Sequence, residues 1–231
     1  MEGTEVRKLA RLEDDHWWYR ERRHLLARSL TGLAPGRAID VGAAGGGNTR
    51  VLRRLGWQAV ALEYGAEGAE VAHERGLATL RGDATRLPLA DASMDLVVEF
   101  DLLEHLDDDD AAVAEVRRVL RPSGTYLVAV PTDPRLWSDH DVAVGHVRRY
   151  TRDGLLDLLH RGGFDTPVVR SWNVLLRPAV ALRRRSSSGS DLDHVHPAVN
   201  LGLRAVITAE RYLPVGRLPG VSMLVEARPR A

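Results

Sequence analysis

The sequence predicts an α/β protein with a mostly parallel sheet of seven strands, helices on both faces and an antiparallel last strand. Short segments rich in aliphatic and β-branched residues alternate with longer segments whose apolar residues recur at helical spacing. Strands that alternate with helices form parallel sheets joined by right-handed crossovers. A run of small residues, 42–47, follows the first strand and supports the same class, because small residues let a backbone approach a ligand closely.

Periodicity and turn residues predict the elements. The expected strands are 37–41, 58–63, 78–81, 94–100, 125–130, 166–172 and 222–227. The expected helices are 5–30, 48–55, 66–75, 107–120, 152–161 and 201–213. Two stretches break the alternation, a long loop at 131–151 and an insertion at 173–220. Within the insertion, the Arg- and Ser-rich segment 183–190 is expected to be a linker.

Composition limits the function classes. The chain has 231 residues, 28% charged and 44% hydrophobic, which is typical of a soluble globular protein. Its net charge of zero argues against a nucleic-acid partner. The absence of cysteine excludes disulfides and thiolate chemistry. With no signal-like start and no apolar run of membrane-spanning length, we expect a cytoplasmic protein.

The length favours one domain with additions. We expect an N-terminal helical cap or lid (1–35), a ligand-binding core (36–172), a helical insertion over the substrate (173–220) and the last strand (221–231). The lid contains the aromatic cluster Trp17-Trp18-Tyr19, of which Tyr19 or Trp18 would close over a bound ligand; the alternative is plain packing of a helix on the sheet.

The glycine-rich run begins after a carboxylate, Asp40. Exposed N–H groups at the start of the following helix can receive polar ligand groups. A negative charge at the strand end suits a cationic or hydroxyl-rich ligand, and it would repel the pyrophosphate of a dinucleotide. The run therefore favours a nucleoside that carries a positive charge.

Several segments resemble class I S-adenosylmethionine (SAM)-dependent methyltransferases, specifically the small-molecule type 11 branch with its Rossmann-like fold. The resemblance covers residues 37–172. It rests on the glycine run from Asp40, on Glu63 at the end of the second strand, on Gly82-Asp83-Ala84, on 93–98 and on Leu103-Glu104-His105. Ala44 stands where the family usually has its middle glycine.

The resemblance implies roles for these residues. Glu63 would accept hydrogen bonds from both ribose hydroxyls, Asp83 would contact the adenine amino group, and Glu99 and Phe100 would line the methionine end. The full set of cofactor-binding candidates is Asp40, Gly42, Ala44, Gly46, Glu63, Tyr64, Asp83, Ala84, Glu99, Phe100 and Tyr19. Asp95 completes a pattern of carboxylates at strand ends; the alternative is that these are solvated turn acids.

The segment from Asp101 to His105 is one candidate for chemistry. Related ubiquinone-pathway O-methyltransferases have Glu-x-x-Glu-His here and hold a divalent metal, and Asp101 replaces the first Glu. Our expectation is no metal, with Asp101, Glu104 and His105 as the set if one binds. His105 as a base, or a packing role for the pair Glu104-His105, are the other interpretations.

The loop after the fifth strand is the second candidate, with His140 and His146. Residues 141–151 resemble a type 11 subgroup that reads Asp-x-x-x-Gly-His-x-Arg-Arg-Tyr-Thr. A histidine beside an acid is a suitable general base near neutral pH, so either histidine would deprotonate a hydroxyl or amine. The alternative is that Arg148, Arg149 and Tyr150 pin the loop by ion pairs.

The predicted function is methyl transfer from SAM, giving S-adenosylhomocysteine (SAH), to an oxygen or nitrogen of a small or medium acceptor in natural-product or lipid-linked or glycan metabolism. The alternative is a SAM-binding protein with other chemistry, such as a cyclase, or a non-catalytic partner. The insertion would cap the acceptor pocket, with an apolar helix stripe at Leu203, Val206, Ile207 and Leu213. Dimer packing or contact of 183–185 with membrane phosphates are alternatives, and the protein is expected as a monomer or homodimer.

Overall fold

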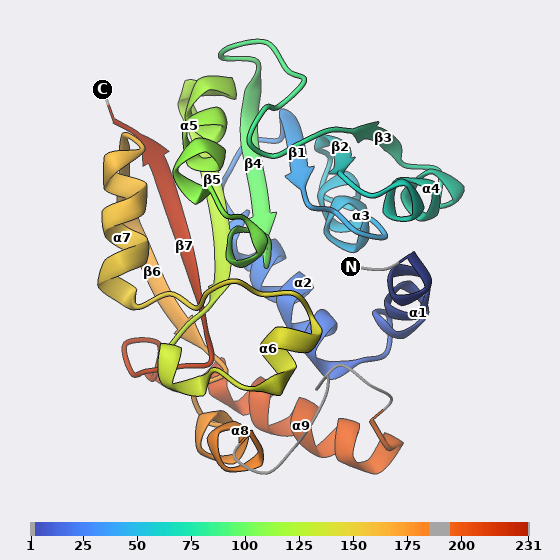
Figure 1. Ribbon diagram of the computed structural model, residues 1–231, viewed down its shortest axis with the longest axis vertical. Helices are drawn as coiled ribbons and strands as arrows, with labels where there is room; N and C mark the ends of the chain where they lie inside the picture. Colours follow the sequence, from blue (N-terminus) through green and yellow to red (C-terminus); the bar gives the residue numbers. More distant parts are fainter. Residues whose placement is uncertain (1–2, 185–194, 231) are drawn as a thin grey trace.

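A single sheet with strand order β3-β2-β1-β4-β5-β7-β6 forms the centre of the molecule (Figure 1). This computed structural model describes residues 3–184 and 195–230. The strands are β1 (Arg37–Val41), β2 (Gln58–Glu63), β3 (Ala78–Arg81), β4 (Met94–Phe100), β5 (Leu120–Pro131), β6 (Phe164–Trp172) and β7 (Ser222–Pro229). The pairs from β3 to β5 are parallel, and β7 runs antiparallel to both β5 and β6. Six strands therefore share one direction and the last opposes them, which confirms the predicted fold class.

Helices cover both faces of the sheet (Figure 1). The α-helices are α1 (Gly3–Leu12), α2 (Trp17–Ser29), α3 (Gly47–Arg54), α4 (Ala66–Glu74), α5 (Asp109–Val119), α6 (Asp139–Ala143), α7 (Arg152–Arg161), α8 (Arg177–Arg183) and α9 (Pro197–Glu210). Two short 3-10 helices, η1 (Leu103–His105) and η2 (Pro134–Leu136), precede α5 and α6. No helix in the described ranges is long and apolar enough to cross a membrane.

The alternation of side chains along β4 divides the core. Val97 faces a cluster with α5 and α7, whereas Leu96 and Val98 face a cluster with α2 and α3. Burial on both faces explains the apolar run Leu96-Val97-Val98 within β4. The sheet thus presents the carboxyl ends of β1, β2 and β4 together, and this is the edge at which open α/β sheets bind ligands.

The single helix predicted over 5–30 is wrong, because the structure divides it into α1 and α2. His16 interrupts it with extended backbone (φ −69°, ψ 130°), and its ring accepts a hydrogen bond from the backbone N–H of Trp18. A side chain that caps its own chain in this way competes with helix continuation. The break directs Glu13 toward Arg75 at the end of α4, so that α1 lies beside α4 (Figure 1).

Three further boundaries differ from the prediction. The strand predicted at 125–130 begins earlier, at Leu120, and the register of β5 against β4 shifts between Met94 and Leu96. The loop predicted at 131–151 contains η2 and α6. The helix predicted at 201–213 begins earlier, at Pro197, since His196 caps it and proline is favourable in a first turn.

The insertion at 173–220 also differs from the prediction in which of its side chains are buried. Only Ile207 of the predicted apolar stripe is buried; Leu203 is half-buried, and Val206 and Leu213 are exposed. Of the predicted linker, residues 185–190 lie outside the described ranges, and Arg183 ends α8. Arg184 points inward, because its guanidinium donates to the Leu136 carbonyl and pairs with Asp141 at 3.4 Å. Arg184 is therefore not placed to meet a membrane surface.

Candidate active site

The loop between β1 and α3 forms a tight cradle of left-handed residues. Gly42, Ala44 and Gly46 have φ angles of 70°, 47° and 79°. A Cβ on Gly46 would lie 2.2 Å from a methyl of Leu77, so only glycine fits there. Ala44, the departure from the family pattern, also adopts the left-handed region, which is unfavourable for a residue with a Cβ.

Asp40 lies under this loop, buried, and accepts a 2.6 Å hydrogen bond from the hydroxyl of Thr49 in α3. Burial raises the pKa of Asp40 to about 6, although the hydrogen bond from Thr49 and the charge of Arg22 oppose the shift. The carboxylate thus joins the strand end to the helix that follows the loop.

Glu63, at the end of β2, completes the cradle. One carboxylate oxygen accepts from the backbone N–H of Ala44 at 2.7 Å, and the other accepts from Gly65 N–H at 3.3 Å. Because a carboxylate offers about four lone-pair sites, Glu63 retains room for two further donors. A Cβ on Gly68 would lie 2.6 Å from the Glu63 side chain, so a larger residue at position 68 would displace Glu63.

Other predicted cofactor residues lie at the same edge. The Asp83 carboxylate accepts from the backbone N–H and the hydroxyl of Thr85, both at 2.8 Å, and Ala84 is buried beside it. Tyr64 is 74% exposed. These residues therefore lie just after the carboxyl ends of β2 and β3, beside the strand that leads into the cradle.

Asp95 does not belong to this edge, and its place in the predicted carboxylate pattern is wrong. It lies near the opposite end of β4, where it accepts from the backbone N–H of Arg37 at 2.8 Å and pairs with Arg121 at 2.5 Å. It therefore links the starts of β1, β4 and β5.

Glu99 and Phe100, predicted to line the same pocket, point to opposite faces of β4. Glu99 is fully buried in the core, where the hydroxyl of Tyr126 donates to it at 2.5 Å. Burial raises the pKa of Glu99 to about 7. Only Phe100 faces the helices α2 and α3, so the structure corrects the pocket role given to Glu99.

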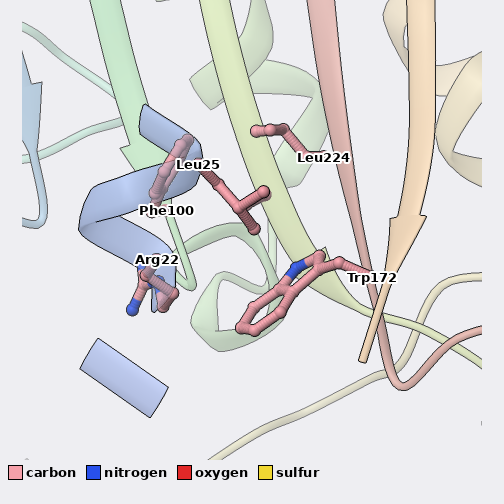
Figure 2. A pocket seen from close by; sticks show the side chains of 6 residues that line it. Arg22, Leu25, Phe100, Trp172 and Leu224 are labelled. Atoms are coloured by element: carbon pink, nitrogen blue, oxygen red, sulfur yellow. The ribbon is translucent and has the colours of Figure 1, made fainter. Parts of the chain in front are cut away.

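A small pocket lies next to Phe100 (Figure 2). Its lining comes from α2, the ends of β4 and β5, and the strands β6 and β7, and consists of Arg22, Leu25, Phe100, Ala129, Trp172 and Leu224. The Arg22 guanidinium stands 5.3 Å from the centre of the Phe100 ring and pairs with Asp101 at 2.5 Å. Sequence reasoning missed Arg22, although it lies one helical turn after Trp18, on the face of the aromatic cluster.

The aromatic segment packs on the pocket from α2. The ring of Trp18 lies 4.4 Å from that of Trp172, and Tyr19 stacks edge-on with His16 at 5.7 Å. This contact with β6 supports a packing role for Trp18 and places α2 over the pocket. Whether it also moves as a lid stays a prediction.

The predicted histidines gather beyond the ends of β4 and β5. The Nδ1 atom of His146 lies 2.8 Å from a carboxylate oxygen of Asp141, and its ring centre is 4.8 Å from that of His105 and 6.2 Å from that of His140. Asp141 is fully buried and also bonds Arg149 at 2.7 Å. Burial alone would raise the pKa of Asp141, but the hydrogen bond to His146 and the charges of Arg149 and Arg184 lower it to about 2.

Glu104 lies against this pair of rings. Its side chain is 0% exposed, and neither carboxylate oxygen accepts a hydrogen bond from another described residue. The nearest described base is Nε2 of His146, 3.8 Å away. Burial and the negative charge of Asp101 raise the pKa of Glu104 well above its usual range.

The three metal ligands considered from the sequence, Asp101, Glu104 and His105, do not form one cluster in the structure. Asp101 pairs with Arg22, and His146 takes its place beside Glu104 and His105. The cluster was not predictable as a unit because His146 comes from a distant segment. The pinning role considered for Arg148, Arg149 and Tyr150 is realised: Arg148 pairs with Asp109, Arg149 with Asp141, and the Tyr150 hydroxyl donates to Asp109.

The segment that forms this edge of the sheet also matches known proteins in sequence. Residues 39–128, which run from the glycine cradle to β5, match the family described as a methyltransferase domain (Methyltransf_11). Over this part of its length the chain is similar to class I SAM-dependent methyltransferases of the type 11 branch. A Mycolicibacterium smegmatis protein named "Probable S-adenosylmethionine-dependent methyltransferase" is 31% identical over 70% of this chain and 65% of its own length.

Solved structures match the fold of this chain at low sequence identity. A chain from the Haloferax volcanii complex of the Trm112 methyltransferase activator with a methyltransferase has a TM-score of 0.68, 20% identity, and coverage of 99% of this chain and 95% of its own. The cyclase SpnF has a TM-score of 0.62 and 21% identity, and the alignment covers 91% of this chain and 80% of that one. The chain spans 65% of the length of the Mycolicibacterium protein and 60% of a Mycobacterium tuberculosis relative.

The cofactor of this family is SAM, and the residues present fit it. Glu63 retains acceptor capacity for a vicinal diol beside the glycine loop. A Cβ on Gly42 would lie 3.0 Å from the side chain of Leu102, so the glycine lets Leu102 pack closely against the loop.

Proposed function

We propose that the protein transfers a methyl group from SAM to an oxygen or nitrogen atom of a small or medium-sized acceptor. The observation that carries this proposal is the single cradle made by the glycine loop and Glu63, joined by the 2.7 Å bond from Ala44 N–H to the carboxylate. When bound, SAM supplies an electrophilic methyl group on its sulfonium. The chain then has to orient the two reactants and take up a proton.

Each part of the edge has a task in this proposal. Glu63 accepts from the ribose hydroxyls, and Asp83 with Ala84 holds the adenine. At the other end, the ion pair of Arg22 with Asp101 offers one charge of each sign beside Phe100, which suits the carboxylate and the ammonium of the methionine part. Packing of α2 over this pocket excludes water from the sulfonium.

The histidine cluster is the acceptor side of the proposal. Asp141 holds Nδ1 of His146 and so leaves Nε2 as the proton acceptor, an arrangement that makes His146 the first choice of base. His105 has a pKa lowered by burial and by the nearby His146, and Gly145 carbonyl oxygen holds its Nδ1 at 3.0 Å. His140, the third candidate, is buried, and its ring centre lies 6.2 Å from that of His146.

Binding of SAH, followed by calorimetry and thermal shift, tests the cofactor site. Replacing Glu63 by Gln removes two charge-assisted acceptors and should weaken SAH binding about tenfold or more. Glu67→Gln, on the exposed side of α4, is the matched control and should bind normally. Absence of SAH binding by the wild-type protein would refute the proposal.

Turnover is tested by release of SAH from SAM with a panel of hydroxyl and amine acceptors. His146→Ala should slow turnover by about 100-fold or more if it is the base, and unchanged turnover would remove that role. SAH binding without release of product from any acceptor class would favour other chemistry on this fold, such as cyclisation.

A further inference from the structure

Glu104 is unusual among the acids of this protein because its carboxylate is buried without a hydrogen-bond donor from another described residue. A buried carboxylate normally pairs with a cation or receives several hydrogen bonds, since desolvation of the charge is costly. Arg22 pairs with Asp101, and Arg149 and Arg184 pair with Asp141. The arginines around it are thus engaged elsewhere.

The two imidazoles beside Glu104 are oriented by acceptors on their other nitrogen. The Gly145 carbonyl can only accept, so Nδ1 of His105 carries the proton in their 3.0 Å hydrogen bond. The Asp141 carboxylate, with a pKa of about 2, likewise accepts from Nδ1 of His146. In the neutral form of each ring, Nε2 is then the nitrogen with a free lone pair. Histidines that bind metal ions commonly donate their other ring N–H to a carboxylate or a backbone carbonyl in this way.

We propose that Glu104, His105 and His146 bind a divalent first-row transition-metal ion through one carboxylate oxygen and two imidazole nitrogens. One ligand atom from each of the three residues lies within 4.8 Å of the others. An ion equidistant from three such atoms would stand about 2.8 Å or less from each, so shifts of about 0.7 Å reach normal Zn–N distances.

The ligand types identify the class of ion. Two imidazoles with one carboxylate are a set that zinc uses in catalytic sites with an open fourth position, and that ferrous iron also uses. Magnesium and calcium prefer oxygen ligands, so they should bind weakly here. A backbone hydrogen bond joins η1, which carries Glu104 and His105, to the segment after α6 that carries His146: the Val147 N–H donates to the Glu104 carbonyl at 2.8 Å.

The ion changes the proposed chemistry of the acceptor side. A metal on Nε2 of His146 takes the lone pair that a base would need. An acceptor hydroxyl that bound the open position would then release its proton to solvent, because the cation stabilises the alkoxide. This consequence rests on the proposed methyl transfer, whereas binding of the ion does not.

Metal binding to chelator-treated full-length protein is the direct test. Calorimetric titration with Zn²⁺ should give one tight site per chain, and Co²⁺ should give the visible absorption of a low-symmetry site with nitrogen ligands. Glu104→Gln and His146→Ala should each weaken Zn²⁺ binding by about 100-fold. His160→Ala, which removes an exposed histidine of α7, should leave binding unchanged.

Two results would overturn the proposal: no stoichiometric Zn²⁺ binding by the wild-type protein, or equal Zn²⁺ binding by the wild-type and Glu104→Gln proteins. Because Gln has nearly the same shape as Glu, thermal unfolding of the metal-free variant should resemble that of the wild-type protein. SAH binding separates the two proposals, since Glu104→Gln should retain SAH and lose Zn²⁺, whereas Glu63→Gln should do the reverse.

Discussion

The glycine cradle and the histidine cluster place acids at neighbouring strand ends but stabilise them differently. At the cradle, Glu63 receives backbone N–H groups from the adjacent loop and from a residue two positions along the chain. At the cluster, Asp141 receives one backbone N–H group, from Ser138, and its other partners are the side chains of His146, Arg149 and Arg184. Backbone donors remain whatever the side chains are, whereas side-chain partners are lost by single substitutions. The cluster should therefore be the more sensitive region.

The largest expected effect is at Asp141. Asp141→Ala leaves Arg149 buried without its counter-ion, and the free energy of unfolding should fall by about 3–5 kcal/mol. Asp139→Ala, in the exposed first turn of the same helix, should cost about 0.5 kcal/mol or less. Urea denaturation measures both. Equal losses would show that the cluster depends on the helix and not on its buried ion pairs.

The expected effect at Glu99 is intermediate in size, because this buried carboxyl group is paired with a single neutral phenol, that of Tyr126, and not with a cation. Its pKa is about 7 in the folded protein against 4.5 ordinarily, so the folded state holds a proton that the unfolded chain releases. The free energy of unfolding should thus fall by about 3 kcal/mol as the pH rises from about 4 to 8.

Glu99→Gln should remove this part of the pH dependence and be more stable than the wild-type protein at pH 8. Urea denaturation at pH 5 and pH 8 gives the comparison. If the difference between variant and wild type does not grow with pH, Glu99 is charged in the fold, and the contrast between neutral and cationic partners fails.

The smallest expected effect is at Ala44 in the cradle. Ala44→Gly relieves a left-handed residue (φ 47°) and should raise the free energy of unfolding by about 0.5 to 1 kcal/mol. Ala43→Gly, which removes a buried methyl group next to it, should be destabilising. A loss of stability in Ala44→Gly would mean that the cradle is not strained at this position.

The cradle was the easier region to predict, and particular residues show why. The observed strands 37–41, 58–63, 78–81 and 94–100 have the predicted bounds, since each is a short apolar run between turn residues. The positions of Asp40 and Glu63 near the carboxyl ends of β1 and β2 follow from those bounds. Asp95 was misplaced because a position at the start of a strand lies at the opposite edge of the sheet from one at its end.

The cluster was predicted only in parts. His105, His140 and His146 were each recognised as candidates, but their meeting with Glu104 depends on the path of the chain between η1 and α6. The pairing of Asp101 with Arg22 was missed for the same reason, since the two residues come from different layers of the fold.

By itself the sequence determined the class of fold, the strand order along the chain and the residues of the glycine cradle. These depend on apolar periodicity and on turn residues, which act between near neighbours. Only the tertiary structure decided which acids have partners: Glu99 has Tyr126, Asp141 has two arginines and a histidine, and Glu104 has no donor among the described residues. Burial and charge pairing are properties of groups brought together in space, and no local pattern encodes them.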